Sequence, residues 1–312
     1  MDRFEAMTIF VSSVETGTFT GASRKLDIPL ATVSRKVSDL EAHLGARLLI
    51  RSTRKLTLTE TGVSYLAHCK KILEQVSDAE REAAGEYLTP RGELVVTAPV
   101  VFGRLHMVGI VSDFLATYPE IFVRLLFTDR TLQLAEEQVD VALRIGHLPD
   151  SSMVATRVGG VCRVVAASPA FLASHGIPKT PGDVSRYPCV SVEVLASGPS
   201  WRFANKNRRG ETTVQIRPRM VVNTAEAAIE AAIKGVGLTH VLSYQATRAV
   251  QEKKLQLVLR DYEPDQVPVS LIHPGQGTLP AKTRRFFEFA VPRLQKILAR
   301  DQNKPLHGDL AD

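Results

Sequence analysis

Cysteine is scarce in this sequence. Only Cys69, Cys162 and Cys189 occur among 312 residues, and they lie far apart. No CxxC pair and no cluster of cysteine with histidine is present, so the spacing indicates neither a disulfide framework nor a zinc site. We therefore expect no metal ion and no other cofactor.

Long apolar runs are also missing, because no stretch approaches the ~20 residues that a membrane-spanning helix needs. Asp2, Arg3 and Glu5 interrupt residues 1–15, which contain no long apolar segment followed by a small-residue cleavage site. We expect a protein that is not exported, does not contact a membrane and remains in the cytoplasm. The composition, with 44% hydrophobic and 23% charged residues, is that of a globular protein, and the length favours two or three domains.

Common catalytic motifs are lacking as well. No P-loop, HExxH pair or GxSxG turn occurs. Gly235-Val236-Gly237 resembles part of a dinucleotide fingerprint, but His240 stands where the third glycine belongs, and the segment follows a predicted helix and not a strand. Cys162 has no His or Asp whose proximity the sequence can establish. We therefore predict that the protein is not an enzyme.

Basic residues are concentrated in one region. The net charge of the whole chain is only +6, whereas residues 18–59 contain eight Lys or Arg and three acids. This excess suits the neutralisation of phosphates, although a solvated helix face is equally rich in charge. The basic residues of the region are Arg24, Lys25, Arg35, Lys36, Arg47, Arg51, Arg54 and Lys55.

Two short helical patterns with a proline between them occupy residues 19–38. Phe19, Ala22 and Leu26 mark the first helix, and Pro29 breaks the pattern because proline disfavours a helical conformation of the residue before it. The second helix has one apolar stripe, formed by Val33, Val37, Leu40 and Leu44. Its other side carries Thr32, Ser34, Arg35, Lys36 and Ser38. This is the pattern of a helix-turn-helix, whose second helix enters the major groove of DNA.

The flanking segments complete a small domain. Residues 3–15 are predicted to form a helix that covers the other two with one face, formed by Phe4, Met7, Val11 and Val14. Residues 47–51 and 56–59 are predicted to be two strands around a basic turn at 52–55. A basic hairpin tip beside a recognition helix indicates a wing that meets phosphates or the minor groove. The alternative is a turn whose charges only keep it soluble.

A long helix is predicted from residue 60 to residue 88, ended by Thr89-Pro90-Arg91-Gly92. Its apolar residues nearly follow an a/d spacing, and they are Leu66, Cys69, Leu73, Val76, Ala83 and Tyr87. A rod of roughly 40 Å cannot bury this narrow stripe on one small domain. We therefore expect it to pair with the same helix of a second subunit in a homodimer.

From Glu93 onward, strand and helix patterns alternate. Strands are predicted at 94–97, 121–127, 139–145, 161–167, 189–194, 213–217, 238–242 and 267–272, and helices at 105–118, 132–138, 170–175, 225–234 and 282–299. This alternation indicates an α/β fold with a mostly parallel sheet. Residues 301–312 are polar and are expected to form a loose tail.

With these parts in order, the chain resembles the LysR-type transcriptional regulators over nearly its whole length. The most specific matches are Gly17-Thr18-Phe19, Ala22-Ser23, Leu26, Val33-Ser34-Arg35, Leu40-Glu41, Leu44-Gly45, Leu48-Leu49, Arg51 and Leu58-Thr59-Glu60-Thr61-Gly62. The resemblance implies an α/β protein with an N-terminal winged helix-turn-helix (1–59, motif 19–38), a linker and dimerisation helix (60–88) and a two-lobed effector domain similar to type 2 periplasmic binding proteins (93–300). It implies that lobe I comprises 93–162 and 268–300, and lobe II 163–267.

The same resemblance assigns the DNA contacts. It places Ala31, Thr32, Ser34 and Arg35 at the floor of the groove, Ser23 and Lys36 near phosphates, and Arg54 on the wing. The guanidinium of Arg35 can bond O6 and N7 of guanine together, worth ~1–3 kcal/mol of discrimination; the alternative is a solvated helix face. Many members have a Ser-Gln-Pro sequence at the start of this helix, whereas this chain has Pro29-Leu30-Ala31. An apolar contact, for instance with a thymine methyl group, is therefore expected there.

Ligands of two-lobed α/β folds lie at the strand ends between the lobes. In lobe I this principle selects Pro99, Val100, Thr128 and Asp129. In lobe II it selects Trp201 and Phe203 as an apolar wall, and Asn223 and Thr224 at the start of a helix whose free N–H groups suit a carboxylate. The alternative for Asn223 is a plain N-cap, and for Trp201 a core aromatic residue. A basic cluster either attracts an anionic effector or protects a strand edge with charge; its members are Arg202, Lys206, Arg208, Arg209, Arg217 and Arg219.

The sequence therefore predicts a regulator that binds double-stranded DNA as a homodimer or homotetramer and responds to a small anionic or aromatic effector. The alternatives are a cytoplasmic α/β enzyme and a solute-binding protein with an accessory DNA-binding domain. Turnover of a metabolite would favour the enzyme, and a discrete footprint without turnover would exclude it.

Overall fold

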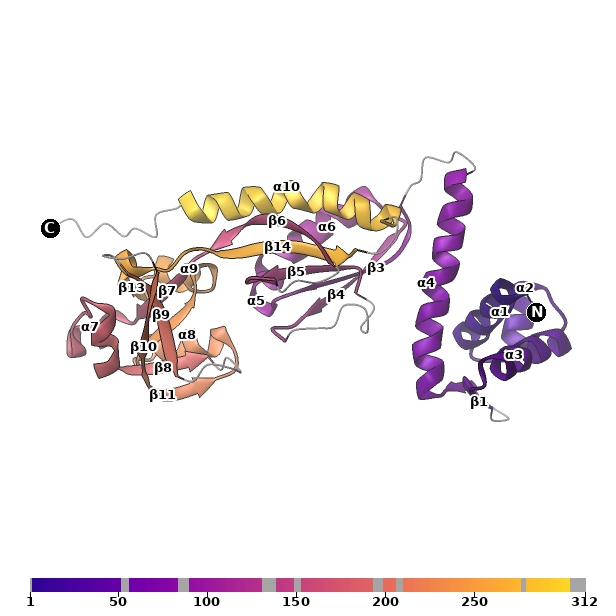
Figure 1. The fold of residues 1–312 in the computed structure, drawn as a ribbon, viewed down its shortest axis with the longest axis horizontal. Helices are drawn as coiled ribbons and strands as arrows, with labels where there is room; N and C mark the ends of the chain where they lie inside the picture. Colours follow the sequence, from indigo (N-terminus) through magenta and orange to yellow (C-terminus); the bar gives the residue numbers. More distant parts are fainter. Residues whose placement is uncertain are drawn as a thin grey trace. The chain divides into compact units, whose positions relative to one another are not determined.

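The computed structural model describes residues 2–51, 56–83, 90–130, 139–148, 153–192, 199–205, 210–275 and 279–303. The chain forms two compact units, Met1–Gly92 and Glu93–Asp312 (Figure 1). Each unit has hydrophobic clusters of its own.

The first unit consists of helices and one short hairpin. Its elements are α1 (Arg3–Thr16), α2 (Phe19–Leu26), α3 (Leu30–Leu44), β1 (Leu49–Arg51), β2 (Leu56–Leu58) and α4 (Glu60–Ala83). The side chain of Asp2 caps α1 by accepting from the N–H of Phe4 at 2.9 Å. Asp27 ends α2 in the left-handed conformation, with a φ of 54°, which aspartate adopts more readily than most residues. The predicted helix-turn-helix is confirmed, and the tip between β1 and β2 lies outside the described residues.

Helix α1 is the centre of this unit, because α2, α3 and α4 all contact it. Ala6, Ile9 and Phe10 are fully buried, whereas Phe4, which was expected on the buried face, is 51% exposed. The prediction for Phe4 was wrong because the buried face of α1 is centred on Ala6, Ile9 and Phe10, although Met7, Val11 and Val14 do pack against the core. Leu44 is exposed too, since α3 ends there and Gly45 turns the chain away with a φ of 62°.

The second unit contains two five-stranded sheets. The first sheet, with its helices, forms lobe I and has the order β4-β3-β5-β14-β6. Its strands are β3 (Gly92–Ala98), β4 (Ile121–Phe127), β5 (Val141–Ile145), β6 (Met153–Val161) and β14 (Val267–Pro274). β3 and β5 are parallel, but β14 runs antiparallel to both β5 and β6. The expected mostly parallel sheet is therefore a mixed one, because β14 returns from the other lobe in the opposite direction.

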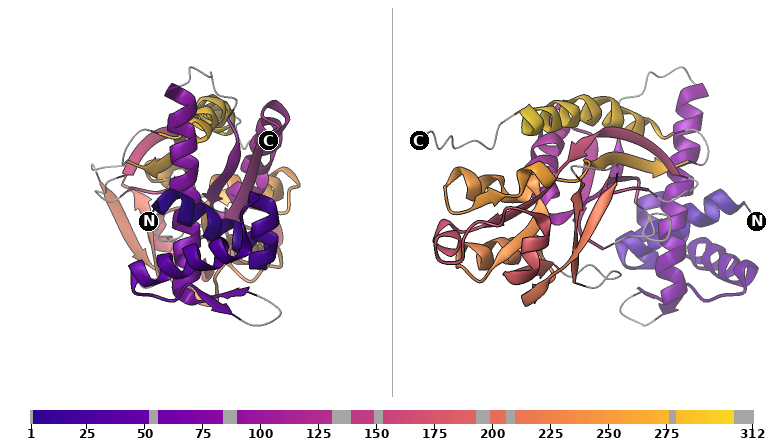
Figure 2. Two further views of the ribbon diagram at one scale, coloured as in Figure 1. Left: turned by 90° about the vertical axis from the view of Figure 1, so that its right-hand side faces the viewer. Right: turned by 60° about the vertical axis from the view of Figure 1, so that its left-hand side comes forward.

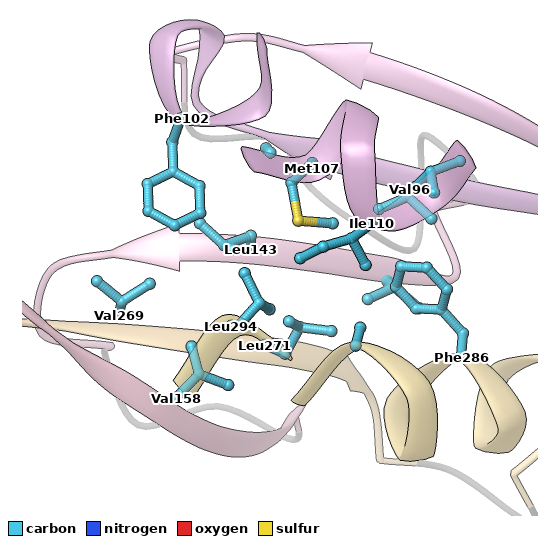
Figure 3. Close-up of a cluster of buried hydrophobic side chains, with 14 of the residues drawn as sticks. Val96, Phe102, Met107, Ile110, Leu143, Val158, Val269, Leu271, Phe286 and Leu294 are labelled. Carbon is cyan, nitrogen blue, oxygen red and sulfur yellow. The ribbon is translucent and has the colours of Figure 1, made fainter. Parts of the chain in front are cut away.

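One face of this sheet is covered by α6 (Val108–Thr117) and α10 (Ala281–Asn303). Figure 3 shows side chains from both helices and from the strands meeting in one cluster, with Ile110, Leu143, Leu271 and Phe286 among them. Phe286 also meets Phe114 edge to face, with 5.1 Å between the ring centroids. This cluster fixes α6 and α10 on the sheet.

The helical segment of lobe I begins earlier than the sequence predicted. α5 (Val100–Phe102) and a π-helical turn, η1 (Gly103–Met107), precede α6. By length and composition alone, the segment Val100–Thr117 is apolar enough to cross a membrane. Its side chains Phe102, Met107 and Phe114 are fully buried in lobe I, and this packing accounts for the apolar composition.

Lobe II is built on the second sheet, with the order β11-β8-β12-β7-β13. Its strands are β7 (Arg163–Ala167), β8 (Pro188–Val192), β11 (Arg217–Val222), β12 (Leu238–Leu242) and β13 (Gln256–Val258). A hairpin packs on one face, made of β9 (Ser200–Ala204) and β10 (Glu211–Gln215). Two helices pack on the other face, α8 (Ala225–Ile233) and α9 (Ser243–Gln251). In the described part of lobe II, the remaining elements are α7 (Pro169–His175) and two 3-10 turns, η2 (Pro181–Arg186) and η3 (Arg260–Tyr262).

Several elements of the second unit differ from the expectation. The sequence pattern did not predict β6, β9, α9 and β13, and it merged β10 and β11 into one strand. α10 continues to Asn303, so the expected tail does not begin at residue 301. The helix predicted at 132–138 and residues 304–312 lie outside the described residues.

Two chain segments join the lobes. The first is Cys162, whose carbonyl accepts from the N–H of Ser243 at 2.8 Å. The second is residues 263–266, between η3 and β14. α10, the yellow helix in Figure 2, lies along β6, where Gly159 leaves room for the side chain of Leu298.

Candidate functional site

One side of helix α3 is buried in the first unit, and the other side is accessible to solvent. Val33, Val37 and Leu40 are buried in the core of the first unit. Ala31 and Arg35 are exposed, and Thr32 and Ser34 are partly exposed. The structure thus brings the four residues predicted for the groove floor onto the accessible side of α3.

The turn before α3 fixes its angle to α2. Ser23 donates from Oγ to the carbonyl of Ile28 at 2.6 Å, and the N–H of Ile28 donates to the carbonyl of Ser23 at 3.1 Å. Ser23, predicted to lie near a phosphate, therefore also holds the turn. Pro29 precedes the helix and provides no side-chain cap, which leaves N–H groups of the first turn open to a partner.

Lys36 has a partner within the unit. It forms an ion pair with Glu5 of α1, and only 19% of its side chain is exposed. A phosphate near Lys36 would compete with this carboxylate. Arg54, predicted for the wing, lies outside the described residues.

The hairpin is attached to α3 and α4 by hydrogen bonds. Glu41 of α3 accepts through Oε1 from the N–H groups of Leu48 and Leu49, at 2.8 and 3.0 Å. Thr59 accepts through Oγ1 from the N–H of Gly62 at 2.9 Å. The strands of the predicted wing are therefore tied to the recognition helix.

In lobe I, the residues predicted for the effector come together where β3 and β4 end. The N–H of Thr128 donates to the carbonyl of Ala98 at 3.0 Å. The N–H of Val100 donates to Oδ1 of Asp129 at 3.1 Å. Asp129 thereby caps α5, because Pro99 makes no side-chain cap.

In lobe II, Asn223 and Thr224 lie between β11 and α8. Oγ1 of Thr224 accepts from the N–H of Ala227 at 3.3 Å, so Thr224 is the N-cap that the sequence had offered as the alternative for Asn223. Asn223 is exposed beside it. The side chain of Asn223 is therefore accessible next to a helix N-terminus.

Trp201 and Phe203 do not form an open apolar wall. They are 6% and 2% exposed, and their rings lie against His240, with centroid distances of 5.2 and 5.7 Å. Alternate residues of a strand point to one face, and this face of β9 packs on the sheet of lobe II. The expectation is corrected to a core position, which the sequence had left open for Trp201.

The sequence reasoning missed three polar residues near the junction of the lobes: Arg163, His240 and Tyr244. Burial, and then the charge of Arg163, lowers the pKa of His240 to about 3, so this imidazole is neutral. Burial raises the pKa of Tyr244 well above its usual range. The available signal was a lone cation at the start of an otherwise apolar run, Arg163 within 161–167.

The described residues define two kinds of site. The first unit presents one helix with a basic, small-residue surface, and the second unit has two α/β lobes joined by two segments. Across the described ranges, no three His, Cys, Asp or Glu side chains gather as a metal ion would require. This combination is that of a helix-turn-helix transcription regulator with a two-lobed ligand-binding domain.

Comparison with known proteins identifies the family. Residues 4–63 match the family described as "Bacterial regulatory helix-turn-helix protein, lysR family", and residues 89–295 match the "LysR substrate binding domain". The chain belongs to the LysR family of transcriptional regulators, and it is a regulator, not an enzyme.

Relatives and solved structures match this chain over more than nine tenths of its length. The HTH-type transcriptional repressor PA14_22550 of Pseudomonas aeruginosa is 35% identical, over 93% of this chain and 92% of its own length. The HTH-type transcriptional activator AaeR of Escherichia coli is 30% identical, over 91% of each chain. The full-length structure of the Vibrio cholerae virulence activator AphB has a TM-score of 0.59 at 27% identity, covering 92% of this chain and 98% of AphB. CrgA of Neisseria meningitidis has a TM-score of 0.59 at 28% identity, covering 93% and 98%.

Proposed function

We propose that this protein regulates transcription in the cytoplasm by binding an operator as a dimer through α3, and that a small molecule between lobes I and II modulates this binding. The observation that carries the first part is the division of α3 into a buried stripe and an accessible side. Val33, Val37 and Leu40 hold the helix, so Ala31, Ser34 and Arg35 are free to approach base edges. Small side chains permit close approach to the groove, and arginine reads guanine through two hydrogen bonds.

The contacts divide into reading and positioning. Arg35, with Ala31, Thr32 and Ser34, reads the groove floor. Ser23 and Lys36 contact phosphates, and Arg54 contacts the backbone or the minor groove from the wing. Phosphate contacts add affinity without sequence information.

The test is footprinting with the full chain. Arg35→Ala is expected to abolish the operator footprint and to leave a weak, salt-sensitive background. His43→Ala is the matched control, because His43 is exposed in the last turn of the same helix, and it should preserve the footprint. An unchanged footprint of Arg35→Ala would refute the assignment.

The burial of the apolar residues of α4 supports dimerisation through this helix. Cys69 is buried in the core of the first unit, and Leu66 packs against that core. Ile72, Leu73 and Val76 are partly buried and lie outside that cluster. They suit a seam with α4 of a second subunit, and two dimers would make a tetramer.

The proposed effector site is formed by residues that follow the ends of strands in both lobes. Pro99, Val100, Thr128 and Asp129 come from lobe I, and Asn223 and Thr224 from lobe II, with the free N–H groups of α8 beside them. A ligand there changes DNA binding only if it binds one arrangement of the subunits more tightly than another. Footprints with and without a panel of acids and aromatic compounds test this, and a footprint that no compound alters would exclude effector control by those classes.

A further inference from the structure

Arg163 is a cation on the inner side of lobe II. It is the first residue of β7, directly after Cys162 of the segment that joins the lobes. The register of β12 and β7 pairs His240 with Val165 and Leu242 with Arg163. Side chains alternate along a strand, so Arg163 shares a face with Val165, and His240 is its diagonal neighbour on that face. This is the face that the β9–β10 hairpin covers.

Among the described residues, no hydrogen bond or ion pair of the Arg163 side chain is present, and the groups that act on it electrostatically are Arg202, Glu211 and Tyr244. Glu211 lies 3.9 Å from Arg202, so this acid is shared with another cation. Burial, and then Arg202, lowers the pKa of Arg163. Arg163 is partly buried, and a cation that loses part of its hydration is normally paired.

His240, the diagonal neighbour of Arg163, is in contact with aromatic rings. The imidazole of His240 stacks on Phe203 with an interplanar angle of 12°, and it also contacts Trp201. Because burial keeps His240 neutral, its imidazole adds no charge that would compete with Arg163 for an anionic ligand. Tyr244 is near enough to act on Arg163 electrostatically, and its ring meets Phe102 of lobe I edge to face at 5.3 Å.

We propose that Arg163 is the anchor for the carboxylate of a small aromatic acid, which is the effector class of this protein. The proposal rests on the effector control proposed above and names its ligand chemistry. A carboxylate would accept two parallel N–H bonds from the guanidinium, and the aromatic body would lie toward the rings near the junction of the lobes. The ion pair then forms beside the segment that joins the lobes, where it can favour one arrangement of them.

The first test needs no ligand. A partly buried cation whose anionic partner is a ligand destabilises the ligand-free protein. Arg163→Met in the full chain is therefore expected to raise the Tm by about 2–4 °C. Arg202→Met, on the exposed side of the same hairpin, is the control and should change the Tm little. A Tm of Arg163→Met that falls by several degrees would identify a structural cation and overturn the proposal.

The second test uses benzoate, benzamide and inorganic phosphate in calorimetric titrations of the full chain. Benzoate should bind at least about tenfold more tightly than benzamide, which has the same shape without the charge. Arg163→Met should remove that preference and leave benzamide binding unchanged, and Arg163→Lys should retain part of it. Equal binding of benzoate and benzamide, benzoate binding unchanged by Arg163→Met, or tighter binding of phosphate than of benzoate would each overturn the proposal.

Operator footprints separate this proposal from the proposed function. Without an added acid, Arg163→Met should give the wild-type footprint, because Arg163 is not in the DNA-binding unit. A normal footprint with no benzoate preference would reject the anchor alone. The absence of any footprint in the wild type would reject the regulator assignment, whatever the titrations show.

Discussion

Leu30 is an exposed apolar residue in the N-terminal turn of α3, where many family members have a polar side chain. It follows Pro29 and is 47% exposed, although leucine is usually buried inside a protein. No side chain caps this end of the helix. An apolar side chain here suits the 5-methyl group of thymine, which is the apolar group of the major groove.

Replacing operator thymines one at a time by deoxyuridine removes only that methyl group and tests the contact. At one position of each half-site, the wild type should bind about fourfold more weakly, which corresponds to about 0.8 kcal/mol for one buried methyl group. Leu30→Ala should lose this sensitivity. Leu44→Ala, the exposed leucine at the other end of α3, is the control, and a Leu30→Ala protein that still distinguishes uracil from thymine would exclude the contact.

Lys36 allows a second test at this scale. If it leaves Glu5 to contact a phosphate, Lys36→Gln should weaken binding to all sequences alike and reduce the slope of log K against log salt by about 1 for each bound helix. Lys254→Gln is the control, because Lys254 pairs with Glu252 in lobe II at 2.7 Å. An unchanged slope for Lys36→Gln would mean that Lys36 serves only to join α3 to α1.

Among the elements of the first unit, α4 and the hairpin are in close contact at Gly62. A Cβ on Gly62 would lie 2.0 Å from the carbonyl oxygen of Leu48. That oxygen accepts from the N–H of Thr59 at 3.0 Å, so it cannot move away without breaking the end of β2. The orientation of α4 to the recognition helix therefore depends on a residue without a side chain.

Gly62→Ala is expected to destabilise the first unit by about 1–3 kcal/mol through overpacking, with a lower thermal transition and a weaker footprint. Gly109→Ala is the matched substitution in a helix with open space around the added methyl group. It should stabilise its own unit by about 0.5–1 kcal/mol, because alanine restricts the unfolded chain more than glycine does. Denaturation followed in each variant measures both effects, and a wild-type transition for Gly62→Ala would show that α4 can shift freely.

For the whole molecule, the decisive feature is the seam on α4. Leu73 and Val76 lie outside the core cluster of their own unit, and the proposed function assigns them to the contact with a second subunit. Two recognition helices at a fixed separation then define the spacing of the operator half-sites.

The double variant Leu73→Glu and Val76→Glu should raise the dissociation constant of the dimer about 100-fold or more, since unpaired charges are costly in an apolar seam. Sedimentation of the full chain measures the association state. Gln75→Glu adds a charge at an exposed position of the same helix and should leave the dimer intact. A double variant that remains dimeric would rule out the α4 seam.

The sequence predicted the first unit more closely than the second. The position of α3 could be predicted from the apolar stripe of Val33, Val37 and Leu40 and from the break at Pro29. Both signals are local, because they depend only on residues close together in the sequence. The strand β6 was missed, since Gly159 and Gly160 weaken its pattern and its pairing partner β14 is far along the chain. α9 was missed because it follows β12 without a glycine or proline to mark its start.

The sequence by itself determined which residues face outward on α3 and the order of helix, turn and helix, because these follow from local spacing and capping. Only the tertiary structure decided that Trp201 and Phe203 belong to the core, that both sheets are mixed, and that Arg163, without an ion pair among the described residues, is a diagonal neighbour of His240. Those outcomes depend on which distant strands become neighbours. An alternating apolar pattern shows that a strand has a buried face, but not what that face is packed against.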